Sequence, residues 1–182
     1  MSGLALDACC LLNLVAAGKI LHENSTKLGF SVFVPKVVAM ESIYILQPDD
    51  DQTGQLVRKE VDMNNYVDRK LVSYCDVEGS YEAELYVQFA VQIDDGEAAC
   101  LAIAKSRSWI MATDDRVARR IATEHTVKVL GTLEIVRTWA ESNSVSDSEI
   151  ALAIGNIQRF AKYAPRANVT DADWWYQKQI AG

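Results

Sequence analysis

Short apolar runs alternate along the chain with longer segments whose apolar residues recur at helical spacing. Residues 4–6, 31–34 and 109–112 are such runs, and we expect each to form a buried strand. Strands that alternate with helices favour the α/β class, in which helices cover both faces of a parallel sheet. Functional sites in such sheets lie outside the carboxyl ends of the strands, so the residues that follow each run are candidates.

The rest of the chain is expected to supply the helices and two weaker strands. Gly18 is expected to close the first helix, and Pro35 to occupy the first position of the second. Residues 49–69 are polar and acidic, and are interpreted as a solvated loop that leads into a helix. Helices are expected at residues 8–18, 36–46, 57–67, 81–92, 97–104, 116–125, 131–141, 150–163 and 171–180, and strands at 70–77 and 127–130.

Length and composition narrow the class of protein. A chain of 182 residues is expected to form one domain, with an appendage at most. The net charge of −7 argues against a protein that coats nucleic acid, but permits an enzyme that meets phosphates through divalent cations. No apolar run reaches the roughly 18 residues of a membrane span, and the start lacks the basic residues of a secretory signal. The four cysteines form no CxxC pair and are interpreted as reduced core residues of a cytoplasmic protein.

The segment DDGEAACLAIA, residues 94–104, places Glu97 at the start of a short apolar helix. Glu97 and Cys100 share one face of this helix with later apolar residues. The two aspartates just before it are placed to cap free backbone N–H groups. One interpretation is that all three acids are ordinary caps and dipole partners, and the other is that they join acids elsewhere in a cluster.

Other acids occupy comparable junctions between an apolar run and a helical pattern. Asp7 and the pair Asp114 and Asp115 follow two expected strands, so a parallel sheet would bring them to one edge. Glu41 lies in the apolar pattern of residues 36–46, where a buried acid is costly unless it is paired or bound to metal. The alternative is that Glu41 occupies the wet face of that helix. We expect one pocket to contain Asp7, Glu41, Glu97 and Asp115.

Carboxylates gathered at one place do not all stay ionised unless cations compensate them. Mg²⁺ or Mn²⁺ prefers such oxygen ligands, and a bound ion orients and activates water for attack on a phosphodiester. No histidine is needed, and neither His22 nor His125 has a ligand partner at a suitable spacing. We therefore expect a divalent-metal site, and a melting temperature that rises with metal in the wild type but not in Asp7→Asn.

Taken in order, these segments resemble the PIN-domain ribonucleases, which include the VapC-like toxins of toxin–antitoxin pairs. LALDACCLLNL resembles the family's first strand, first acid and next helix, and VPKVVAMESIY the segment with the second acid. DDGEAACLAIA is similar to the variant with a third acid in a GEA motif, and MATDDRVARRIA and VLGTL resemble the fourth-acid segment and last strand. The resemblance covers about residues 3–140.

The resemblance implies a three-layer α/β/α fold and an endoribonuclease that cleaves RNA with Mg²⁺ or Mn²⁺. The acidic set that it implies, with the metal ligands among them, is Asp7, Glu41, Glu97 and Asp115. The family pattern T-x-D places the fourth acid at Asp115, and Asp114 is kept as an alternative. A PIN-like domain is implied over residues 1–142, with two helices in an extension over 143–182. A toxin would also have an antitoxin protein as its partner.

Residues beside the acids are candidates for contact with the RNA. They are Asn13, Thr113, Arg116 and Arg119. Asn13 lies on the helix after Asp7 and either orients the site or faces water. The arginines either hold a phosphate or form a solvated basic face, together with Arg120.

Three other functions compete with this one. A phosphatase of the haloacid-dehalogenase type uses Asp-x-Asp after its first strand, but Asp7 is followed by Ala8 and Cys9. An exonuclease of the DEDD type expects Asp-x-Glu on its first strand, which is also missing. A non-catalytic PIN-like binding module remains open, although all the required acid types are present.

The C-terminal helices must bury at least one face. Ile150, Ile157 and Phe160 recur at helical spacing, and Trp174 and Trp175 add a large aromatic surface. This surface packs either on the chain's own body or on a second copy. Because PIN-like proteins are often dimers, the favoured expectation is a homodimer.

Overall fold

A five-stranded parallel sheet forms the centre of the computed structural model, which describes residues 2–180 except 28, 42, 50–53, 143 and 144. The strand order is β5-β2-β1-β6-β7, and every neighbouring pair runs parallel. The strands are β1 (Ser2–Leu6), β2 (Phe30–Pro35), β5 (Ser73–Cys75), β6 (Ile110–Ala112) and β7 (Val129–Leu130). Leu4, Ala5 and Leu6 in the middle strand are fully buried, because helices cover both faces of the sheet to which these side chains point in turn. The expected α/β class is confirmed.

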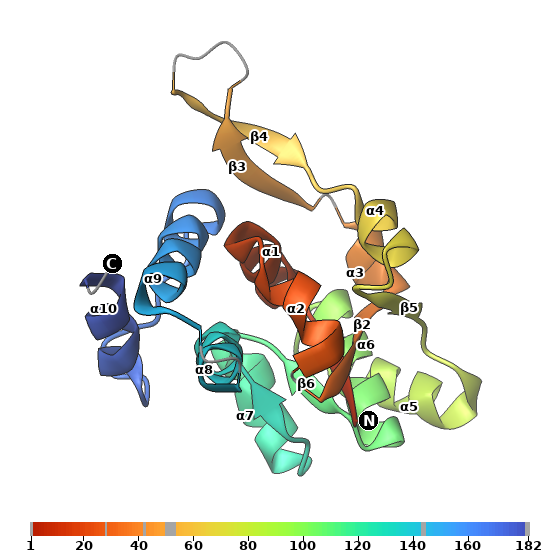
Figure 1. The fold of residues 1–182 in the computed structure, drawn as a ribbon. Helices are drawn as coiled ribbons and strands as arrows, with labels where there is room; N and C mark the ends of the chain where they lie inside the picture. Colours follow the sequence, from red (N-terminus) through yellow and green to blue (C-terminus); the bar gives the residue numbers. More distant parts are fainter. Residues whose placement is uncertain (1, 28, 42, 50–53, 143–144, 181–182) are drawn as a thin grey trace.

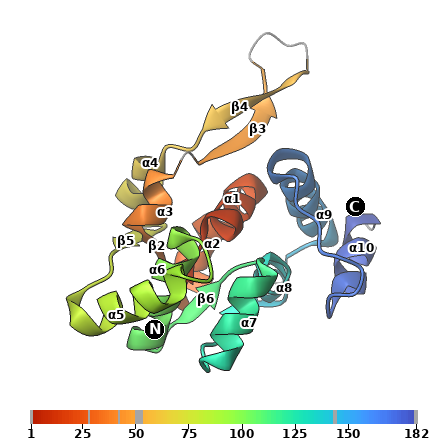
Figure 2. The ribbon, with the colours of Figure 1, turned by 180° about the vertical axis from the view of Figure 1, so that it is seen from behind.

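Helices cover both faces of the sheet and extend past one side of it. Those described are α1 (Ala8–Ala17), α2 (Ile20–Lys27), α3 (Lys36–Met40), α4 (Met63–Asp68), α5 (Gly79–Ala90), α6 (Asp95–Arg107), α7 (Arg116–Glu124), α8 (Thr132–Ser142), α9 (Asp147–Asn156) and α10 (Ala172–Ile180). The two opposite views show α1 and α2 on one face and α5 and α6 on the other (Figures 1 and 2). α9 packs against α1, and α10 packs against α9.

The prediction was wrong in one region, residues 36–69. The helix expected over 36–46 ends at Met40, and the chain continues as β3 (Tyr44–Pro48). β3 pairs antiparallel with β4 (Leu56–Glu60). The helix expected over residues 57–67 therefore starts later, as α4, and the Asp62 side chain caps it. Tyr44 and Ile45 in β3 and Val57 in β4 favour strands, but the apolar residues of this region also fit a helical spacing, which explains the error. The resulting hairpin projects from the body (Figure 1).

The other elements agree with the prediction to within a few residues, apart from α2, which the sequence pattern did not indicate. Gly18 closes α1 with a φ of 78°, as expected. Pro35 ends β2 and precedes α3, whereas the prediction placed it inside the helix. α9 starts earlier than expected because Ser146 and Glu149 form a capping box, and it changes into a π-helical turn, η1 (Ile157–Ala161).

The chain's own body covers the C-terminal helix. Trp175 is fully buried, and its ring meets Tyr163 edge-on with 5.8 Å between the centroids. This arrangement is the intramolecular docking that the sequence left as an alternative, and the homodimer stays a prediction. Within the described residues, no helix combines the length and apolar character that a membrane crossing requires.

The Trp109 indole packs directly on the backbone of Gly3, which has no side chain. The indole also stacks on Phe33, with 4.2 Å between the ring centroids. A methyl group at Gly3 would lie only 2.2 Å from Trp109 Cδ2. Gly3→Ala is therefore expected to lower the free energy of unfolding by about 1–3 kcal/mol, the usual cost of overpacking. Urea denaturation measures this change. Gly155→Ala is the control, because nothing lies within 4 Å of its added methyl group, and an equal loss in both variants would contradict the prediction.

Candidate active site

The register of the sheet brings two acidic segments together. β1 and β6 are neighbours, with Leu6 beside Ala112, so Asp7 and Thr113 leave the sheet at the same edge. The Asp7 N–H donates to the Ala112 carbonyl at 3.1 Å, which continues the pairing one step past β1. The segment that follows β6 therefore starts directly beside Asp7.

Asp7 caps α1 and is almost fully buried. Its Oδ1 accepts the Cys10 N–H at 2.7 Å, and its side chain is 2% exposed. The pKa of Asp7 is raised to about 7, mainly by burial and in smaller part by the charge of Asp114. Hydrogen bonds from Thr113 and Cys10 oppose it by favouring the ionised form.

Glu97 lies in the first turn of α6, within electrostatic reach of the acids that follow β1 and β6. Its pKa is raised to about 7, first by burial and then by the charges of Asp115, Asp7 and Asp94. The Asp94 N–H donates to its carboxylate and acts in the opposite direction. Glu97 is thus both a helix cap and a member of a group of like charges.

The same carboxylates also affect the pKa of the Cys9 thiol. Its pKa is raised to about 12 by burial and then by the charges of Asp7, Asp114, Glu97 and Asp115. These carboxylates therefore all lie within electrostatic reach of the first turn of α1. Cys9 is exposed at this site, so its assignment to the core was wrong, whereas the other three cysteines are buried.

Glu41 lies at the margin of the group. It follows α3 with an extended backbone, is exposed, and its pKa is raised by burial and by Asp94 and Asp95. A methyl group at Gly96 would come within 2.6 Å of Glu41 Oε1, so the glycine lets this carboxylate approach the start of α6. Glu41 thus approaches the first turn of α6, the helix that carries Glu97, from the end of α3.

Asp114 and Asp115 differ sharply in their partners. The Asp115 carboxylate is exposed, and its Oδ1 accepts the N–H groups of Val117 and Ala118 at 2.7 and 2.9 Å. Its Oδ2 receives no hydrogen bond from the described residues. The donors to Asp114 come from three parts of the chain, namely Cys10 Sγ, Asn13 Nδ2, Thr132 N, Thr132 Oγ1 and Tyr163 OH. Protein groups therefore occupy both oxygens of Asp114, while one oxygen of Asp115 stays accessible.

Two of the residues expected to contact RNA are held inside the protein. Asn13 is 3% exposed and donates to Thr132 at 2.9 Å as well as to Asp114. Thr113 is fully buried, accepts the Asp115 N–H at 3.1 Å and bonds to Asp7. Both residues thus position the acids, and neither offers its side chain to a substrate.

The arginines of α7 also differ. Arg119 pairs with Glu134 at 2.7 Å and donates to the Thr113 carbonyl, so it braces the turn after β6. Arg120 pairs with Glu124 on the surface. Arg116 is exposed beside Asp115, and no described carboxylate pairs with it. It is the arginine of this helix that is placed to meet a phosphate.

Two further residues of this region could not be identified from the sequence pattern. Thr132 binds Asp114 through its backbone and its hydroxyl, and Tyr163 reaches Asp114 from the C-terminal extension. The helix start after Gly131 was visible in the sequence, but its contact with Asp114 was not. Tyr163 is 49 positions away from its partner and belongs to no motif.

The donors fit a hard divalent cation by their chemistry. Asp7, Glu97 and Asp115 supply carboxylate oxygens, and the raised pKa values of the first two show a charge that a cation would compensate. Among the described residues, no group of three or more acids, cysteines or histidines is arranged closely enough to hold one ion. The arrangement suits an ion such as Mg²⁺, which keeps several waters and takes one or two carboxylates.

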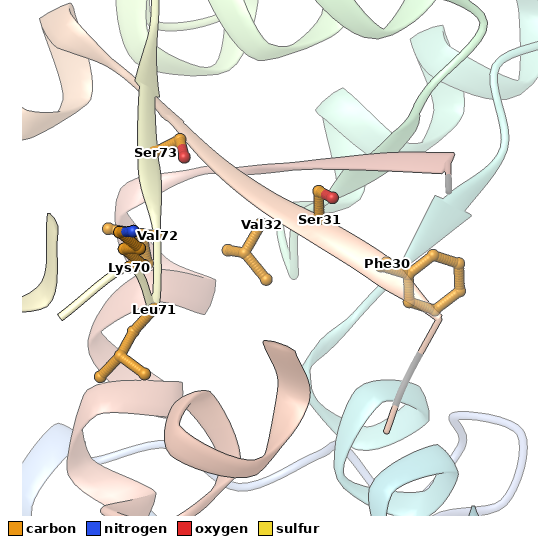
Figure 3. A pocket seen from close by; sticks show the side chains of 7 residues that line it. All are labelled: Phe30, Ser31, Val32, Lys70, Leu71, Val72 and Ser73. Atoms are coloured by element: carbon orange, nitrogen blue, oxygen red, sulfur yellow. The ribbon is translucent and has the colours of Figure 1, made fainter. Parts of the chain in front are cut away.

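Two surface hollows lie outside this cluster. One of about 180 Å³ opens between the first half of β2 and residues 70–73, at the opposite edge of the sheet (Figure 3). The other, of about 500 Å³, lies between the base of the hairpin and α4. Glu41 borders it together with Glu60 and Asp62, so this hollow adjoins the outer margin of the acidic group.

Comparison with known proteins gives one match. The model of a family described as a PIN domain covers residues 4–169. The matched region includes α9 and η1 and ends before α10, so it extends past residue 142, where the domain boundary was predicted. No curated protein and no solved structure gives a significant match.

Proposed function

Because the chain belongs to the PIN-domain family, whose members are in general nucleases, we propose that it is a metal-dependent endoribonuclease. The observation that carries this proposal is the gathering of Asp7, Glu97 and Asp115 around the first turn of α1. Three carboxylates within electrostatic reach of one another repel each other, and this repulsion lowers the stability of the folded protein unless a cation compensates it. PIN domains typically act on nucleic acid with divalent metal ions, and these acids have the matching chemistry.

The roles follow from the partners of each side chain. One or two of the carboxylates of Asp7, Glu97 and Asp115 would bind the metal directly, and the rest would bind its waters; the metal would supply an activated water and neutralise charge on the phosphodiester. Glu41 would contact the ion or its waters from the outer side of α6. Thr113 fixes the distance between Asp7 and Asp115, and Arg116 would bind a non-bridging phosphate oxygen. RNA is proposed as the substrate because the sequence resembles ribonucleases.

Cleavage of a structured RNA with Mn²⁺ or Mg²⁺ tests the function. We expect internal cuts that need the metal and disappear with a chelator, and no hydrolysis of para-nitrophenyl phosphate. Asp115→Asn is expected to lower the cleavage rate about 100-fold or more, because the loss of even an outer partner of a metal site costs about 10–100-fold. Asp62→Asn, another helix cap, is the control and should cleave normally.

Equal activity of Asp115→Asn and the wild type would contradict the proposal. Binding of RNA without any cleavage would instead favour a PIN-like binding module. The role as a toxin stays a prediction, and a small neighbouring gene for an antitoxin would support it.

A further inference from the structure

The C-terminal extension touches the acidic site through one side chain. The Tyr163 hydroxyl donates to Asp114 Oδ1 at 3.1 Å, and its ring meets the Trp175 ring edge-on. Burial and the neighbouring Asp114 charge raise the pKa of this phenol, so it stays a donor. Asp114 directly precedes Asp115, and Tyr163 therefore fixes the extension against the turn that carries a proposed catalytic acid.

The backbone before Tyr163 has an unusual conformation. α9 changes into the π-helical turn η1, and Lys162 then adopts a φ of 60°. π-Helical turns often occur at functional sites, and a lysine rarely adopts a positive φ unless its surroundings hold it there. The hydrogen bond of Tyr163 to Asp114 is such a constraint. The residue that directly follows Lys162 is therefore held at the acidic site.

This segment also presents cations without acidic partners. Arg159, Lys162 and Arg166 are exposed, and no described carboxylate forms an ion pair with any of them. Many other cations of this acidic chain are neutralised locally, for example Lys19 by Glu149 and Lys178 by Asp147. Unpaired Lys and Arg side chains supply most of the affinity of a protein for a nucleic-acid backbone.

We propose that residues 159–166 form part of the RNA-binding surface of the active centre, with Tyr163 as the anchor and Lys162 and Arg166 as the phosphate-binding groups. The proposal rests on the proposed function, because it assigns the substrate of that function to this surface. An RNA strand whose scissile phosphate lies at Asp115 would pass over the docked segment. Tyr163 is a positioning residue, since it acts through Asp114 and through the segment that it anchors.

The first experiment measures binding of a single-stranded RNA oligonucleotide by fluorescence anisotropy at several salt concentrations, in full-length protein with Asp115→Asn to prevent cleavage. Lys162→Gln is expected to weaken binding about 5-fold, as for the loss of one exposed charge pair. It should also lower the slope of log affinity against log salt by about 0.7, the value for one phosphate contact. Arg166→Gln should act in the same way.

Lys128→Gln is the matched control. Lys128 is also exposed and unpaired with any described carboxylate, but it precedes β7, whereas Thr132, which contacts Asp114, follows that strand. It should leave the affinity and the salt slope unchanged. Equal weakening by Lys128→Gln and Lys162→Gln, or no weakening by the latter, would overturn the proposal.

The second experiment tests the anchor. Tyr163→Phe keeps the ring against Trp175 and removes only the hydroxyl, and Tyr176→Phe removes a hydroxyl that donates to the Pro165 carbonyl in the same extension. Tyr163→Phe should weaken RNA binding about as much as Lys162→Gln, and Tyr176→Phe should not. Because Tyr163 positions Lys162, the double variant with Tyr163→Phe and Lys162→Gln should bind RNA no more weakly than either single variant.

Fully additive effects would show that Tyr163 does not position Lys162, and would overturn its role as anchor. Binding does not depend on catalysis, so the two proposals fail separately. If the wild type binds RNA as described but does not cut it, the proposed function fails and the binding surface stands. If Lys162→Gln binds RNA normally while the wild type cuts it, the reverse holds.

Discussion

Asp7→Asn is expected to stabilise the metal-free protein above neutral pH, although it removes a residue of the proposed active site. The pKa of Asp7 is about 7 in the folded protein, against 3.8 for an ordinary aspartate. Between these values the folded state keeps a proton that the unfolded state has lost. The free energy of unfolding therefore falls as the pH rises from about 4 to about 7, and the penalty is complete above pH 7.

The size of the effect follows from the shift of the pKa. A difference of about three pKa units corresponds to a cost on the order of 4 kcal/mol. Asn keeps an oxygen for the Cys10 N–H but carries no charge, so the variant avoids this cost. Urea denaturation of metal-free protein at pH 5 and pH 8 measures it. The wild type should lose stability between these pH values, and Asp7→Asn should lose less.

Metal should narrow the difference in stability between the two proteins. An ion that binds only the folded state adds about 2.7 kcal/mol at a concentration of 100 times its dissociation constant. Mn²⁺ or Mg²⁺ is expected to raise the melting temperature of the wild type and to leave Asp7→Asn unchanged. Asp62→Asn, which changes a cap outside the acidic group, should respond like the wild type. If neither the pH nor millimolar metal changes the stability of the wild type, the prediction of a buried, charged site that binds metal is wrong.

The gathering of acids was visible in the sequence because it follows from the sheet. Asp7 and Asp115 come just after strands that pair side by side, and Glu97 starts a helix that packs on the same strands. Local patterns are enough to locate such junctions. The hairpin was missed because the apolar residues that form β3 also fit a helical spacing, and only pairing with β4 decides between the two. Tyr163 was missed because its contact with Asp114 depends on the docking of the whole extension.

The two interpretations of these acids turn out to be compatible. Asp7 caps α1, Asp115 caps α7, and Glu97 accepts the Asp94 N–H at the start of α6. The positive ends of these helices partly offset the negative charge. Capping therefore holds each carboxylate in place, and the accessible Oδ2 of Asp115 shows that a cap also has an oxygen left for a ligand.

Asp114→Ala is expected to lower the free energy of unfolding by about 3 kcal/mol, because each buried donor left without an acceptor costs about 1–3 kcal/mol. The donors affected include Asn13 Nδ2, the Thr132 N–H and the Tyr163 hydroxyl. Removal of its charge relieves Asp7 and offsets part of the loss. For a chain of this length, 3 kcal/mol corresponds to a fall in melting temperature of about 6–12 °C.

Asp115→Asn should behave in the opposite way, although the two aspartates are adjacent. Asn is as good a helix cap as Asp, so its oxygen can still accept the Val117 and Ala118 N–H groups, and the melting temperature should change little. Its cleavage rate should nevertheless fall about 100-fold or more. Differential scanning fluorimetry and the RNA cleavage assay on both variants separate the roles. If Asp114→Asn, which retains one acceptor oxygen, folds normally and loses more activity than Asp115→Asn, then Asp114 is the catalytic acid, and the hydrogen bonds that surround it do not define its role.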